Sequence, residues 1–75
     1  MNKKRRKELG DWIEKIERLK SELEMIQWYE EDYYNAIPEN LQGGKNAIKS
    51  EDALDKIADA IISLEEAVEA IEEII

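Results

Sequence analysis

Apolar residues recur in this chain at alternating intervals of three and four residues, in two stretches separated by a single break. Such spacing places apolar side chains along one stripe of an α-helix, as in coiled coils and helical bundles. The break contains Pro38, Gly43 and Gly44, and a proline disfavours helical conformation in the residue before it. The pattern therefore predicts an all-α fold, an antiparallel hairpin of two long helices.

We expect one domain, with the first helix at residues 4–36, the loop at residues 37–44 and the second helix at residues 45–74. The second helix has two possible starts. Ser50 is a good N-cap residue and two acidic residues follow it, whereas a start near Lys45 keeps Ala47 in the heptad register. We favour the earlier start, because it also makes the two helices similar in length.

The apolar stripe can be described by heptad columns, with Leu9 placed at position a. In the first helix, column a is then Leu9, Ile16, Leu23, Glu30 and Ile37, and column d is Trp12, Leu19, Ile26 and Tyr33. In the second helix, column a starts at Ala47 and column d at Ser50, and column g adds Ala53, Ala60, Ala67 and Ile74. Because the apolar surface is this broad, we expect two hairpins to pair into a four-helix bundle.

The chain has few other means of stabilising a fold. It has 75 residues, without cysteine or histidine, and a core of this size rarely contributes more than about 3–5 kcal/mol. Disulfides, Cys/His zinc sites and the Glu-x-x-His motif of di-iron bundles are excluded. We expect no metal and no cofactor. Self-association is the remaining way to stabilise the fold, and the heptad pattern supports it.

Charge is unevenly distributed over the chain, whose net charge is −8. Residues 1–20 carry eight Lys/Arg and four Asp/Glu, whereas residues 21–42 carry six acids and no base. Phosphate binding needs clustered cations, so direct nucleic-acid binding is not expected beyond the basic run at residues 3–7. That run is either a helix start paired with the acidic end of the second helix or an arm for nucleic acid or an acidic partner. No apolar run approaches the length of a membrane span, and a cytoplasmic location is expected.

The strongest candidate site is an aromatic and acidic cluster just before the loop. Its residues are Trp28, Tyr29, Glu30, Glu31, Tyr33 and Tyr34. Tyr and Trp commonly anchor protein interfaces, so the cluster is either a binding patch or part of the packing between helices. Glu30 occupies an a position, where a carboxylate is costly unless paired. No nucleophile–base pair and no Gly-rich phosphate loop is present, and we expect no enzyme.

Three features carry a resemblance to a known group of proteins. They are the basic N-terminus at residues 3–7, the loop sequence Ile-Pro-Glu-Asn-Leu-Gln at residues 37–42, and the Ala/Glu-rich second helix. Together they resemble small helical-hairpin proteins of Gram-positive bacteria and their phages. The resemblance implies a helical hairpin and a mobile-element setting, and it transfers no functional residue.

The functional prediction is a non-enzymatic protein-interaction module, a self-associating hairpin with an acidic surface. One alternative is a phage-encoded inhibitor of a host defence or nucleic-acid enzyme, of the anti-CRISPR or DNA-mimic kind, whose partner is a host protein. Another is a small-ligand binder that uses pockets between the helices near Trp28 and Tyr33.

Overall fold

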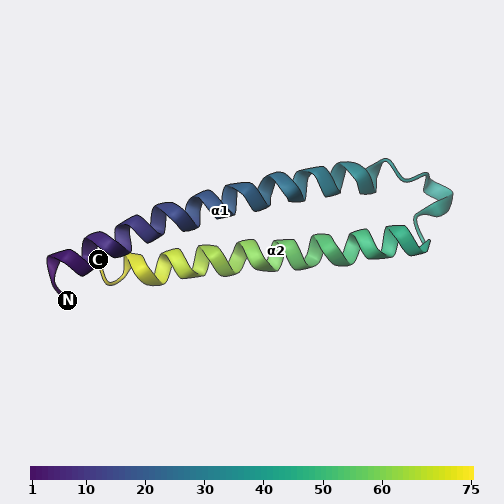
Figure 1. The fold of residues 1–75 in the computed structure, drawn as a ribbon. Helices are drawn as coiled ribbons and strands as arrows, with labels where there is room; N and C mark the ends of the chain where they lie inside the picture. Colours follow the sequence, from purple (N-terminus) through teal and green to yellow (C-terminus); the bar gives the residue numbers. More distant parts are fainter.

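The computed structural model describes all of residues 1–75 and contains two long helices and one short one. Helix α1 spans Lys3–Asn35, the 3₁₀ helix η1 spans Glu39–Leu41, and α2 spans Lys45–Glu72. The two long helices lie side by side in opposite directions, with both chain termini at one end and η1 at the other (Figure 1). The molecule measures 59 × 15 × 12 Å. The predicted all-α antiparallel hairpin is confirmed.

Local hydrogen bonds set the ends of α1 and the shape of the loop. The side chain of Asn2 caps α1 by accepting a hydrogen bond from the backbone N–H of Arg5 at 2.9 Å. After α1 ends, Pro38 has an extended backbone, and the Gln42 side chain donates to the carbonyl of Ile37 at 2.9 Å. At Gly44 a Cβ atom would lie 3.0 Å from the Leu41 carbonyl oxygen, so the turn into α2 favours glycine there.

Helix α2 begins at Lys45, the earlier of the two predicted starts. Ser50 therefore lies inside the helix and does not cap it. The residue is 2% exposed, and its hydroxyl donates a hydrogen bond to Glu30 Oε1 at 3.0 Å. This contact explains how α1 accommodates a carboxylate at an a position: Glu30 is half-buried and has a partner on the opposite helix.

The packing of α1 against α2 corrects one part of the heptad assignment. The half-buried side chains of α1 and the turn after it belong mainly to columns a and e: Leu9, Ile13, Ile16, Lys20, Leu23, Gln27, Glu30, Tyr34 and Ile37. Column d lies outside the contact, with Trp12, Leu19, Ile26 and Tyr33 between 50% and 55% exposed. One partner helix covers only one side of α1, so an apolar stripe three columns wide cannot be buried against it completely.

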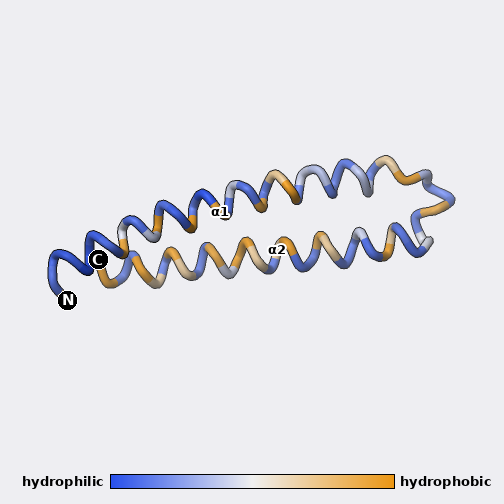
Figure 2. Tube along the Cα trace, in the orientation of Figure 1, coloured by the Kyte–Doolittle hydropathy of each residue, from blue (hydrophilic) through white to orange (hydrophobic).

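The core of the isolated hairpin is small. Only four residues are buried, namely Ala47, Ser50, Ile61 and Val68, and all of them lie on α2. Figure 2 shows that hydrophobic residues recur along α2, whereas α1 is more hydrophilic, above all in its first turns. Neither helix is long and apolar enough to cross a membrane.

Candidate interaction surface

One edge of the hairpin is polar and is closed by contacts between the e columns of the two helices. Lys20 Nζ lies 3.8 Å from Glu65 Oε1, and the Tyr34 hydroxyl donates a hydrogen bond to Glu51 Oε1. This hydrogen bond, with partial desolvation, raises the pKa of Tyr34 above its usual value. The pKa of Lys20 is also raised, first by its contact with Glu17 and then by the nearby carboxylates.

The other edge is apolar and only partly covered. On each helix the d column lies on the opposite side of column a from column e, so the meeting of the e columns turns both d columns toward this second edge. Column d of α1 is exposed there, whereas column d of α2 is partly covered by α1, since Ser50 is buried and the residues that follow it in the column are half-buried. A groove at the loop end supports the assignment, because Tyr33 of column d and Asn46 of column g both line it. We call this surface the open face. It comprises Trp12, Leu19, Ile26 and Tyr33 of α1 and Ala53, Ile57, Ala60, Leu64, Ala67, Ile71 and Ile74 of α2.

The two helices contribute differently to the open face. Helix α1 presents large side chains that are at least half exposed. Helix α2 presents half-buried Ile57, Leu64 and Ile71, flanked by a column of alanines. Small side chains let another helix approach closely, and large ones fill the grooves between helices. The combination of large side chains on α1 and small ones on α2 is therefore typical of a surface that packs against another helix, and it extends along the whole open face.

Shallow grooves mark both ends of the open face. At the loop end, a groove of about 510 Å³ is lined by Tyr33, Ile37, Pro38 and Leu41, among others. At the terminal end, a groove of about 210 Å³ includes Leu9 and Trp12. The Lys15 ammonium lies 4.3 Å from the centre of the Trp12 ring, a cation–π contact that covers part of this exposed aromatic.

The residues of the predicted aromatic and acidic cluster do not lie on one face of α1. The six residues point in three directions around α1. Glu30 and Tyr34 face α2 and bond to Ser50 and Glu51. Tyr33 belongs to the open face and is 50% exposed.

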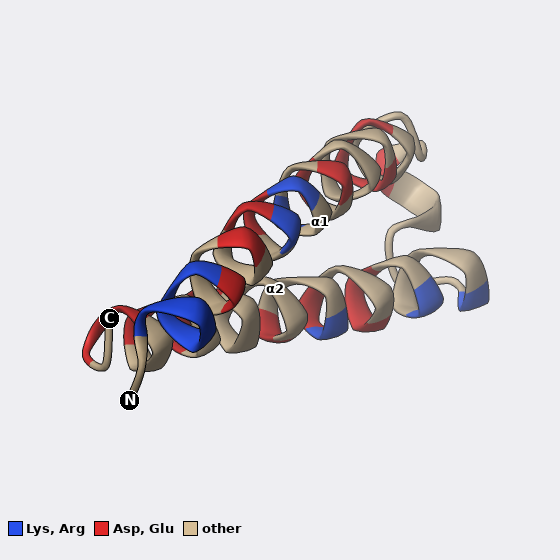
Figure 3. Ribbon diagram, turned by 60° about the vertical axis from the view of Figure 1, so that its left-hand side comes forward, with Lys and Arg blue, Asp and Glu red and all other residues tan.

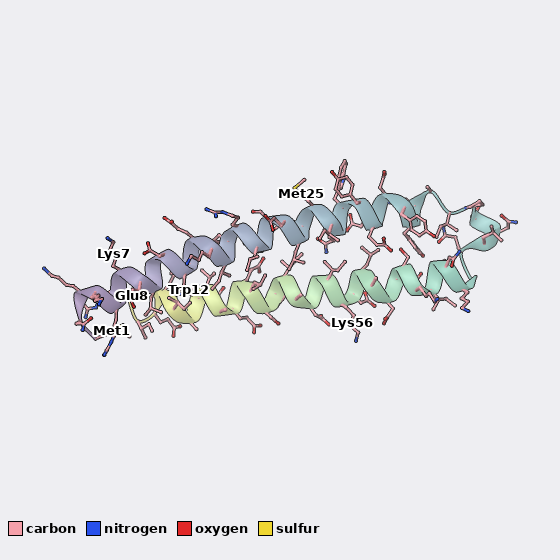
Figure 4. The ribbon with its side chains drawn as sticks, in the orientation of Figure 1. Met1, Lys7, Glu8, Trp12, Met25 and Lys56 are labelled. Carbon is pink, nitrogen blue, oxygen red and sulfur yellow. The ribbon has the colours of Figure 1, made fainter.

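Trp28, Tyr29 and Glu31 form the outward part of the cluster, and all three are exposed. The Trp28 and Tyr29 rings lie 5.4 Å apart at a tilt of 50°, and their residues are 62% and 58% exposed. The neighbouring Met25 is 55% exposed and points away from α2 (Figure 4). This aromatic pair is therefore not part of the packing between α1 and α2.

The charged residues at the terminal end lie close together without pairing. Lys and Arg gather on the first turns of α1, beside the acidic end of α2 (Figure 3). The only ion pairs within 4 Å are those of Lys20 with Glu17 and Glu65, so none of the five cations at residues 3–7 pairs within the chain. The predicted pairing of this run with the end of α2 therefore does not form as direct contacts. No group of three or more Asp/Glu side chains could hold a metal ion.

The sequence signal for the open face is the width of the apolar stripe on α1, which extends beyond columns a and d. Ile13 and Tyr34 lie in column e, next to column a on the side away from column d. Apolar or aromatic residues therefore occupy three adjacent columns of α1. A stripe of this width indicates packing against more than one helix, and its outer column is the one that the hairpin leaves open.

No protein family, curated protein or solved structure matches this chain.

Proposed function

We propose that this chain is a non-enzymatic protein-interaction module that works by self-association. In this proposal the open faces of two hairpins pack together and form a four-helix bundle. The partner implied first is a second copy of the chain, and the acidic outer surface of the bundle is what other molecules would meet.

The excess of exposed surface carries the proposal. The hairpin exposes 5954 Å², whereas a compact monomer of 8.8 kDa exposes about 4,800 Å² by the usual scaling with mass. Part of this difference of about 1,200 Å² reflects the elongated shape, 59 Å long and 15 Å or less across. The part that bears on self-association is apolar: Trp12, Leu19, Ile26 and Tyr33 are between 50% and 55% exposed in the hairpin.

The small core supports the same conclusion. Ala47, Ile61 and Val68 are the only buried apolar residues, and the chain has no cysteine for a disulfide. A two-helix hairpin without a larger core is marginal in water, because helix formation depends mainly on packing of an apolar face. Pairing two open faces would enclose the d columns of all four helices and supply that packing.

Sedimentation equilibrium of the full chain at micromolar concentration tests the proposal. We expect a dimer, with a helix content by circular dichroism that falls on dilution as the dimer dissociates. A well-folded monomer across the same concentration range would overturn the proposal.

A second candidate function, capture of another protein, is favoured by the exposed aromatic pair. Trp28 and Tyr29 lie outside the packing between α1 and α2. Glu24, Glu31 and Asp32 are exposed and lie three or four positions from Trp28 along α1, a spacing that places side chains near one another on a helix. A surface of this kind suits a cationic partner with an apolar residue to cover the rings. Replacing Trp28 with alanine should leave the helix content and the dimer unchanged but remove capture of such a partner. Loss of folding would instead assign Trp28 to the packing.

A further inference from the structure

We infer that the exposed pair Trp28 and Tyr29 binds an arginine side chain of another protein, with Glu31 and Asp32 as the anions that pair with its guanidinium. This inference rests on the second candidate function, capture of another protein, and names the chemistry that the captured partner presents. It does not depend on self-association of the hairpin. It requires that the pair stays accessible in a bundle and that the chain itself supplies no cation for it.

The pair stays accessible when two hairpins form a bundle. Trp28 lies in column f of α1, and Met25, which points away from α2 (Figure 4), lies in column c. A four-helix bundle packs around columns a and d, so columns c and f face water in it. Tyr29 lies in column g, at the edge of the open face. The exposure of Trp28 and Met25, 62% and 55%, therefore persists in the dimer, and another molecule must supply any cover for them.

The two tryptophans of the chain differ in what lies beside them. Trp12 has a lysine three positions further along α1, and the Lys15 ammonium lies 4.3 Å from the centre of its ring. At the same spacing Trp28 has Glu31, and one position further on it has Asp32. Because side chains three and four positions apart are neighbours on a helix, Trp28 has carboxylates where Trp12 has a cation. A cation from outside the chain would meet both the ring and the carboxylates.

No cation of the same chain covers Trp28. Residues 21–44 contain no Lys or Arg. Lys20 lies eight positions before Trp28, which is about 12 Å along the helix axis. Its ammonium lies 3.4 Å from a carboxylate oxygen of Glu17 and 3.8 Å from one of Glu65, so it is already paired elsewhere. The cation for the aromatic pair must therefore come from another molecule.

Arginine suits this surface better than lysine does. A guanidinium is planar, so one face stacks on the indole of Trp28 while its N–H groups donate to carboxylates. Neither Glu31 nor Asp32 forms an ion pair within the hairpin, so both are free to accept. The Tyr29 ring lies 5.4 Å from that of Trp28 at a tilt of 50°, and it offers a second aromatic surface to the aliphatic part of the same arginine side chain.

The charge around the pair disfavours the same surface of a second copy as its cover. Residues 21–42 carry six acids and no base, so two such surfaces facing each other would oppose like charges. A basic segment has the complementary charge. Within this chain the densest basic segment is the run at residues 3–7, which makes that run of a second copy the competing occupant.

Binding of a fluorescently labelled peptide tests the inference. The probe is a peptide that contains Arg-Leu-Arg among neutral residues, and the comparison is the same peptide with lysine in place of both arginines. Fluorescence anisotropy measures the dissociation constant, and sedimentation of the same samples reports self-association. We expect saturable binding that weakens as salt is raised and is roughly two- to five-fold tighter for the arginine peptide. Equal binding of the two peptides would overturn the assignment to a guanidinium.

Glu31→Gln with Asp32→Asn removes the two anions and leaves both rings in place. The matched control is Glu66→Gln with Glu69→Gln, which makes the same charge change at exposed positions of α2. The first variant should weaken binding of the arginine peptide by roughly five-fold, whereas the control should change it by less than about two-fold. Equal weakening in both variants would show a general attraction to an acidic protein and would overturn the site.

Two further variants separate this inference from the proposals on which it borders. If Trp28→Ala removes binding while Glu31→Gln/Asp32→Asn does not, capture through the rings stands and the arginine chemistry is overturned. Replacing the five cations at residues 3–7 with glutamine should leave peptide binding unchanged; tighter binding would assign the pair to a second copy and overturn the inference. No binding of either peptide to a chain that sediments as a dimer would overturn the capture site and leave self-association intact.

Discussion

Replacing Leu19 and Ile26 with glutamine should dissociate the dimer, because these residues occupy the centre of the open face. Each is 53% exposed in the hairpin, and complete burial of such a side chain is worth about 1.5–3 kcal/mol. Association would therefore add about 1 kcal/mol for each side chain. With two such residues in each of two copies, we expect a loss of about 4 kcal/mol, or roughly 1,000-fold in the dissociation constant. Glutamine has a helix propensity close to that of leucine, so α1 should not be weakened by propensity.

The matched control is the double replacement of Ile48 and Ile62 with glutamine. These residues are 57% and 50% exposed and lie in column b of α2, on the side away from the open face. Their replacement should change the free energy of association by less than about 0.5 kcal/mol. Sedimentation equilibrium of both double variants, with circular dichroism to follow helix content, makes the comparison. Equal weakening in the two variants, or no weakening in Leu19→Gln/Ile26→Gln, would refute the assignment of the open face.

Three further predictions follow from contacts within the hairpin. Gly10→Ala should raise the free energy of unfolding by about 1 kcal/mol, because alanine favours a helix more than glycine does and no atom lies within 4 Å of the added Cβ. Gly44→Ala should lower the free energy of unfolding, because its Cβ would lie 3.0 Å from the Leu41 carbonyl oxygen. Chemical denaturation measures both changes. Glu30→Leu with Ser50→Ala removes both partners of one hydrogen bond and extends the apolar column, so stability should stay the same or rise by up to about 1 kcal/mol; a fall larger than that would show that the hydrogen bond is needed for folding. The raised pKa of Tyr34 means that its contribution to stability is complete below the usual tyrosine pKa and is lost as the pH rises through the folded value, since ionisation removes the proton donated to Glu51. Thermal unfolding between pH 8 and 11 should therefore show a smaller decline in Tyr34→Phe than in the unsubstituted chain, and identical declines would contradict the assignment.

The sequence by itself determined the fold class, the position of the turn and the start of α2, and it placed the other helix ends within two residues of those observed. The heptads indicated two helices, and the proline and glycines located the turn between them. Helix α2 begins at Lys45, where the register argument placed it, although Ser50 offered a competing cap. These features are local, because helix periodicity and the backbone restrictions of proline and glycine act within a few residues along the chain.

Only the tertiary structure decided how α1 is rotated about its own axis. Three adjacent columns of α1 carry apolar or aromatic residues, and the sequence pattern is satisfied whichever two of them face α2. Two contacts across the hairpin require this rotation of α1. Lys20 lies near Glu65, and Tyr34 donates a hydrogen bond to Glu51, only when column e of α1 faces α2. That rotation leaves Trp12, Leu19, Ile26 and Tyr33 on the outside. It also divides the aromatic cluster among three directions, because adjacent residues of a helix lie about 100° apart. The physical reason is that periodicity defines a stripe on one helix, whereas the part of the stripe that is buried depends on where the second helix lies.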